Sequence, residues 1–136
     1  MQGGHPELLV SCKAGEEWFG RFAPGTPYRF SEWAEDFDVA KEAALSASLV
    51  IVDRYGLSPE LRAALQATAG ALVVFDDFGE FIPSRGTLIN GSPGAFLLEY
   101  PEIEGLQLLL GPAYQVLREP FWAPAPHKLQ TTIEEV

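Results

Sequence analysis

Two apolar runs that each end in acidic residues constrain the fold of this chain more than any other feature. They are residues 49–53 (Leu-Val-Ile-Val-Asp) and residues 71–77 (Ala-Leu-Val-Val-Phe-Asp-Asp). Short unbroken apolar runs are typical of parallel strands that are buried on both faces. Between the runs, Ser58 suits a helix N-cap and Pro59 the first helical position, so a helix is expected to continue to about Ala69. Strand, helix and strand at this spacing predict a βαβ unit with two adjacent, parallel strands.

The rest of the chain adds shorter elements of the same kinds. Apolar, β-rich runs predict further short strands, and apolar residues at helical spacing predict one more helix. The expected strands cover residues 8–12, 28–30, 87–90 and 106–110, and the expected helix covers residues 31–47. We therefore expect an α/β fold with a Rossmann-like, mostly parallel sheet and flanking helices. This domain should occupy residues 1–119 and be followed by a proline-containing tail over residues 120–136.

The strongly acidic composition limits the partners that the chain can bind. Nineteen Asp and Glu residues against nine Lys and Arg residues give a formal net charge of -10. A field of this sign repels phosphate backbones and anionic lipid surfaces, so neither nucleic acid nor a membrane is expected as a partner. An anionic small ligand such as a nucleotide sugar would have to be held by local backbone N–H groups and helix N-termini.

Cysteine content and the first residues indicate a cytoplasmic protein. The single cysteine, Cys12, cannot form an internal disulfide, and it lies in an apolar run where a strand would bury it. No apolar stretch approaches the roughly 20 residues needed to span a bilayer. The first residues also lack the basic start and the apolar region of a signal peptide.

Polar side chains directly follow the two apolar runs. Asp53 and Tyr55 come at the end of the first run, and Asp76 and Asp77 end the second. Ligands of open α/β sheets bind beyond the carboxyl ends of the strands, so these residues are the first candidates for a binding site. In one interpretation they face a cleft, where Tyr55 offers a hydroxyl group and a ring to a sugar. In the other, the carboxylates cap turns or neighbouring helices, as Asp does routinely.

Four blocks of the sequence, in order and at similar spacing, resemble one protein family. They are residues 53–57 (Asp-Arg-Tyr-Gly-Leu), 74–77 (Val-Phe-Asp-Asp), 88–90 (Leu-Ile-Asn) and 109–121 (Leu-Leu-Gly-Pro-Ala-Tyr-Gln-Val-Leu-Arg-Glu-Pro-Phe). The chain resembles the UDP-2,4-diacetamido-2,4,6-trideoxy-altropyranose hydrolases of pseudaminic acid synthesis and the related spore-coat polysaccharide biosynthesis proteins.

The resemblance implies both an architecture and a ligand. Proteins of this family are built like GT-B glycosyltransferases, with two Rossmann-like halves and the nucleotide sugar bound between them. This chain resembles most of the N-terminal half. By the resemblance the ligand is a UDP-sugar, no cofactor is needed, and the substrate-binding residues are Asp53, Tyr55, Asp76, Asp77 and Asn90.

The catalytic motif of the family is the part that the chain lacks. Members open with a strand and a Gly-x-Gly-His-x-x-Arg turn, whose histidine is understood to activate the hydrolytic water. Residues 3–5 (Gly-Gly-His) resemble this turn, but no strand precedes them and no arginine follows at that spacing. His5 matches better the family's later Gly-His turn, which precedes its second strand, and His127 lies in the tail.

No other catalytic group stands out in the sequence. No serine lies in a nucleophile elbow, and no spaced set of His and Cys residues could bind a metal. We therefore expect no catalytic residue, no metal site and negligible hydrolysis by this chain alone. Three functions fit these observations: a partial or divergent UDP-sugar hydrolase-like domain, a non-catalytic assembly or binding module, and a glycosyltransferase half-domain.

The same resemblance predicts an unfilled position in the sheet. The first strand of the family would lie between the strands at residues 8–12 and 49–53, so without it two apolar edges are expected to be unpaired. The chain could pair these strands directly, insert residues 106–110 between them, or cover the edge with a second copy. We expect a homodimer. Its interface would use the sheet edge or the aromatic residues Trp18, Phe19, Phe121 and Trp122.

Overall fold

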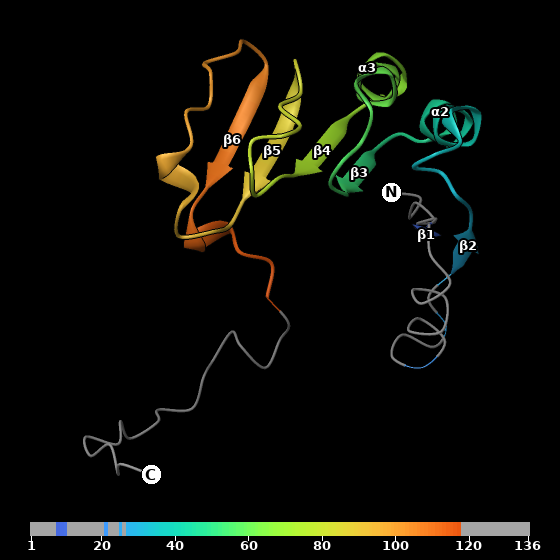
Figure 1. The fold of residues 1–136 in the computed structure, drawn as a ribbon, viewed down its shortest axis with the longest axis horizontal. Coiled ribbons are helices and arrows are strands. Elements are labelled where there is room, and N and C mark those ends of the chain that lie inside the picture. Colours follow the sequence, from blue (N-terminus) through green and yellow to red (C-terminus); the bar gives the residue numbers. More distant parts are fainter. Residues whose placement is uncertain (1–7, 11–20, 22–24, 26, 118–136) are drawn as a thin grey trace, which may run out of the picture.

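The computed structural model describes residues 8–10, 21, 25 and 27–117 and has an α/β fold (Figure 1). In chain order the elements are β1 (Leu8–Val10), β2 (Tyr28–Phe30), α2 (Phe37–Ser46), β3 (Val50–Asp53), α3 (Pro59–Thr68), β4 (Leu72–Phe75), β5 (Gly86–Asn90), η1 (Ala95–Leu97), β6 (Leu106–Leu110) and η2 (Pro112–Tyr114). One sheet has the order β3-β4-β5-β6, and β1 and β2 form a second sheet. Every one of these pairings is parallel, as in a Rossmann-like fold.

The predicted βαβ unit is confirmed. Val50 to Asp53 of β3 pair in register with Leu72 to Phe75 of β4, and α3 connects the two strands. The predicted start of α3 is also confirmed, because the Ser58 hydroxyl oxygen accepts the N–H of Leu61 at 3.2 Å. As a result, β3 and β4 end at the same level of the sheet.

The predicted start of α2 near residue 31 is wrong. The helix begins at Phe37, and its N-cap is Asp36, whose Oδ1 accepts the N–H groups of Asp38 and Val39 at 3.2 Å each. The N–H of Ser31 still donates to a carbonyl oxygen of β1. Ser31 therefore directly follows β2, and a turn separates it from the helix.

The strands differ little from the predicted ranges. β6 has the predicted bounds, and β3 and β5 each differ by one residue at their starts. The run 71–77 is a strand only to Phe75, because the following acidic residues belong to a turn. Residues 11–12 of the expected first strand and the expected tail, residues 120–136, lie outside the described residues.

The edge of β3 is not closed by either of the two strands considered for it. β1 pairs with β2, and β6 pairs with β5 at the far edge of the larger sheet. Within the described part of the chain, β4 is therefore the only strand that pairs with β3.

The larger sheet is packed on one face, so the expectation that residues 49–53 are buried on both faces is wrong. The core unites Ala40 and Ala44 of α2 and Leu61 and Leu65 of α3 with alternate strand residues. Those strand residues are Val52, Leu72 and Val74. Both helices therefore pack against the same face of the sheet. The side chain of Ile51 points to the opposite face, where it is 60% exposed. No helix among the described residues has the length and apolarity to cross a bilayer.

Gly86 allows a test of how closely β5 approaches β4. Its φ is +104°, and a Cβ atom there would lie 2.3 Å from the carbonyl oxygen of Leu72. Gly86→Ala is expected to lower the free energy of unfolding by about 2 kcal/mol or more, since the backbone conformation and the contact both disfavour alanine. Urea denaturation should show a lower midpoint with an unchanged slope.

The matched control is Gly94→Ala. Gly94 has a φ of -84°, and a Cβ atom there would meet nothing within 4 Å. This variant should change the free energy of unfolding by less than about 0.5 kcal/mol. Equal midpoints for the two variants would contradict the close approach at Gly86.

Candidate functional site

Two turns beyond the carboxyl ends of β3 and β4 are joined by hydrogen bonds. The Tyr55 hydroxyl group donates to Asp77 Oδ2 at 2.7 Å, and the N–H of Gly56 donates to Glu80 Oε2 at 3.1 Å. Gly56 has a φ of +67°, in the left-handed region that favours glycine. The turn after β3 and the turn after β4 are therefore held together by two contacts from consecutive residues.

Arg62 of α3 holds the same turns from the helix side. Its Nε donates to the carbonyl oxygen of Leu57 at 2.8 Å, and its Nη1 donates to the carbonyl oxygen of Glu80. Its guanidinium also lies 6.0 Å from the centroid of the Phe81 ring. One side chain from the connecting helix thus fixes the segments that follow both strands.

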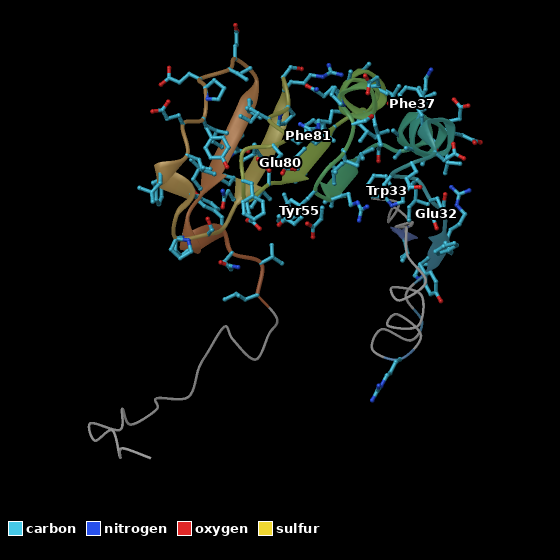
Figure 2. All side chains as sticks on the ribbon, in the orientation of Figure 1. Glu32, Trp33, Phe37, Tyr55, Glu80 and Phe81 are labelled. Atoms are coloured by element: carbon cyan, nitrogen blue, oxygen red, sulfur yellow. The ribbon has the colours of Figure 1, made fainter. Side chains whose placement is uncertain are left out.

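A hollow of about 380 Å³ opens beside these turns at the carboxyl edge of the sheet. Its floor consists of Asp53, Phe75 and Ile89, which lie in register across β3, β4 and β5 on the face opposite the helices. Figure 2 shows Tyr55 beyond the carboxyl ends of these strands. The walls come from residues that follow the strands, namely Tyr55, Asp77, Gly91, Tyr114, Gln115 and Val116.

Aromatic and apolar groups surround the mouth of the hollow. The rings of Tyr55 and Phe78 have centroids 5.2 Å apart and are tilted by 58°. Phe78 is 66% exposed, and Tyr55 and Tyr114 are each 45% exposed. Exposed rings beside carboxylates are a common setting for a ligand that is polar at its edges and apolar on its faces.

A second hollow, of about 540 Å³, lies beside β6 and is less suited to chemistry. It is lined by Pro101, Glu102, Ile103, Glu104, Leu106 and Leu108. Its ionisable groups are two exposed glutamates, and it does not include the residues that follow the strands. We therefore take the smaller hollow as the candidate site.

The structure divides the five predicted site residues into two sets. Asp53, Tyr55 and Asp77 line the hollow, whereas Asp76 and Asn90 do not. Asp76 is 2% exposed and Asn90 is 0% exposed. The division follows from the strand geometry, because successive side chains point to opposite faces of a sheet.

Asn90 belongs to a buried hydrogen-bond network. Its Nδ2 donates to the Tyr100 hydroxyl oxygen at 2.9 Å, and its Oδ1 accepts the N–H of Ser92 at 3.0 Å. The Tyr100 hydroxyl group in turn donates to the backbone carbonyl oxygen of Asp76 at 3.3 Å. Burial raises the pKa of Tyr100, the hydrogen bond with Asn90 opposes this rise, and the negative charges of Asp76 and Asp77 add to it. In this network Asn90 ties the end of β5 to the loop that precedes β6.

Asp76 caps the turn that carries Asp77. Its Oδ1 accepts the N–H of Glu80 at 3.1 Å, and among the described residues none donates to its buried Oδ2. A buried acceptor without a donor costs about 1–3 kcal/mol, which the bond to Oδ1 offsets in part. The position of Asp76 agrees with the interpretation of a turn cap.

The electrostatic field at the hollow is negative. The hydrogen bond to Asp77 raises the pKa of Tyr55 to about 12, and desolvation and the charges of Asp77, Asp53 and Asp76 act in the same direction. The phenol of Tyr55 is therefore protonated at neutral pH. It can donate or accept a hydrogen bond, but it is not available as a phenolate base or nucleophile.

Two carboxylates and two phenols are the ionisable side chains among the described residues that line the hollow. Among all the described residues, no three His, Cys, Asp or Glu side chains are placed to hold a metal ion. His5 and His127 both lie outside the described residues. The arrangement that remains is suited to binding, with Asp53 and Asp77 as acceptors and Tyr55 as a ring and a hydroxyl group.

Several residues of the site were not predicted from the sequence. Phe75 and Ile89 form the floor because they alternate with core residues, a pattern of period two that could have indicated them. Tyr114 is the last residue of η2, and Gln115 and Val116 follow it in an irregular segment, so no periodicity predicts where these side chains point. Glu80 had no signal of its own, because its contact is to the backbone of Gly56.

Titration of the tyrosines tests the bond between Tyr55 and Asp77. One tyrosine of the wild-type chain should ionise near pH 12, and Asp77→Asn should return it toward the ordinary value of 10. Because the pKa is raised in the folded state, the bond stabilises fully below about pH 10 and loses its effect as the pH rises through about 12. NMR of labelled tyrosine rings resolves the groups. An unchanged set of values in Asp77→Asn would contradict the bond.

The comparisons with known proteins do not add to this description. No protein-family model, no curated protein and no solved structure matches the chain. The function must therefore be argued from the site itself.

Proposed function

We propose that the hollow at the carboxyl edge binds the sugar portion of a UDP-sugar. The observation that carries this proposal is the bonded pair of Tyr55 and Asp77 at the mouth of a hollow floored by Asp53, Phe75 and Ile89. A sugar presents hydroxyl groups at its edges and C–H groups on its faces. Carboxylate acceptors beside an aromatic ring match both surfaces.

The charge distribution supports the sugar end rather than the diphosphate. Among the residues that the structure describes, no Lys or Arg lines the hollow, and two of the lining residues are aspartates. A diphosphate would meet repulsion there, whereas hydroxyl groups would find acceptors. Under this proposal the protein is a cytoplasmic, hydrolase-like domain of surface polysaccharide or nonulosonic acid biosynthesis that binds its ligand without turning it over.

A non-catalytic assembly or binding module is the second candidate. The observation that favours it is the apolar outer edge of β3, with which no other strand in the described part of the chain pairs and where Ile51 is 60% exposed and Leu49 is 49% exposed. Under this function the partner is either a second copy of the chain, as the sequence predicts, or a different polypeptide. No described feature favours a glycosyltransferase half-domain over these two.

Binding measurements on Tyr55 variants test the sugar site. We expect UDP-N-acetylhexosamine to bind the wild-type chain at millimolar concentration. Loss of one hydrogen-bonding hydroxyl group in Tyr55→Phe should weaken binding about three- to tenfold, and loss of the ring in Tyr55→Ala should weaken it further. Isothermal titration calorimetry measures each dissociation constant.

The control for this measurement is Gln107→Ala. Gln107 is exposed on β6 and does not line the hollow. Its substitution should leave the dissociation constant unchanged. The sugar site is wrong if the wild-type chain binds none of the ligand at millimolar concentration, or if both Tyr55 variants bind as the wild type does.

A turnover assay separates binding from catalysis. General acid–base catalysis contributes typically about 10²–10⁴-fold, and the family resemblance assigns it to the histidine of a Gly-x-Gly-His-x-x-Arg turn that residues 3–5 do not match. The purified chain should therefore release UDP from UDP-N-acetylhexosamine no faster than a buffer blank. Release at a rate typical of enzymes would contradict this, and would direct attention to His5 and His127.

A further inference from the structure

The free edge of β3 presents unpaired backbone groups. The N–H of Val50 donates to the carbonyl oxygen of Ala71 at 2.9 Å, so Val50 bonds toward β4. In a parallel ladder, alternate residues bond to the same neighbour. The N–H and C=O of Ile51 therefore point away from β4, and within the described residues no strand pairs with them.

Two exposed aliphatic side chains lie on this edge. Leu49 and Ile51 are 49% and 60% exposed. We call Leu49 and Ile51 the edge patch. A partner that covered these side chains would remove their apolar surface from water.

The edge has few of the features that usually protect an exposed strand, since β3 is four residues long and its one charged residue, Asp53, stands at its carboxyl end. Such strands are commonly guarded by lysine, proline, charge or a bulge. Residues 48–52 (Ser-Leu-Val-Ile-Val) contain none of these residue types, although the whole chain has a net charge of -10. Residues 49–52, which precede Asp53, form an apolar stretch in an acidic molecule, and such a stretch is suited to an uncharged, apolar segment that lies along it.

The position of the smaller sheet limits the width of that partner. β1 and β2 lie on the side of the free edge of β3 (Figure 1). A second copy that extended the sheet would bring its own β4 toward β1 and β2. A single extended segment needs only one strand position, so it suits the edge better.

We propose that the edge of β3 receives one extended, uncharged segment of aliphatic residues from a partner polypeptide, which adds a strand to the sheet. Its backbone bonds to the N–H and C=O of Ile51, and its side chains cover the edge patch. This interaction is independent of the UDP-sugar proposal, because none of the edge-patch residues lines the hollow.

The test uses a labelled peptide with a Val-Ile-Val-Ala-Val core and lysines at both ends for solubility. Fluorescence anisotropy should show saturable binding to the full chain. A peptide with proline at its centre should not bind, because it lacks the central N–H. Hydrogen exchange of the Ile51 amide in the wild-type chain should slow when the first peptide is added.

Two lysine variants form the matched pair. Ile51→Lys should weaken peptide binding by about tenfold or more, because it places a charge at the edge. Gln107→Lys adds the same positive charge on β6, at the position that aligns with Ile51 across the four strands of the sheet. This control should change the dissociation constant of the peptide less than about twofold. Circular dichroism checks that both variants are folded.

Three results would overturn the proposal. One is the absence of peptide binding and of any change in Ile51 exchange. Another is equal weakening by both lysine variants, which would indicate attraction between the cationic peptide and the acidic chain. The third is self-association of the wild-type chain that Ile51→Lys abolishes, since a second copy would then occupy the edge.

Discussion

The parallel register between β3 and β4 is the constraint on which the rest of the described structure depends. It places Asp53 opposite Phe75, so that the turns carrying Tyr55 and Asp77 begin at the same level. The 2.7 Å bond between those two side chains requires this alignment. A slip by one residue would move one turn by about 3.3 Å relative to the other and would exchange the two faces of the strand. Side chains that now line the floor of the hollow would then point into the core, and core side chains would point into the hollow.

The packing of both helices on one face explains two features that otherwise look unrelated. The core draws Val52 and Val74 to the helix side, and the alternate residues Ile51 and Phe75 are left on the other side. At the carboxyl edge, the chain after β6 covers part of that second face and makes it a hollow. At the edge of β3, no described segment does so, and apolar side chains are exposed. The same half-covered sheet therefore provides both the candidate site and the candidate docking edge.

Sequence patterns predicted what depends on local chemistry and missed what depends on packing. The N-cap at Ser58 and the apolar runs placed α3, β3 and β4, because a short-range bond or a periodic pattern determines them. The start of α2 was missed because both Ser31 and Asp36 are residue types that favour the N-cap position. N-cap preferences alone do not decide which of the two begins the helix. The sequence grouped Asp76 with Asp77, but consecutive residues at a strand end point to opposite faces, and only Asp77 lines the hollow. Burial of β3 on both faces could not be judged, because it depends on where helices distant in sequence pack.

The acidity of the hollow decides the orientation in which a nucleotide sugar could bind. Two unit charges 4 Å apart interact with about 4 kcal/mol at the effective dielectric of a protein surface. A hydrogen bond from a neutral donor stabilises a bound state by only about 0.5–1.5 kcal/mol. A phosphate placed beside Asp53 and Asp77 would therefore lose more by repulsion than the Tyr55 hydroxyl group could restore. Hydroxyl groups of a sugar meet no such repulsion and can donate to the same carboxylates. If a UDP-sugar binds in the hollow, its sugar rather than its diphosphate is expected to lie beside these carboxylates.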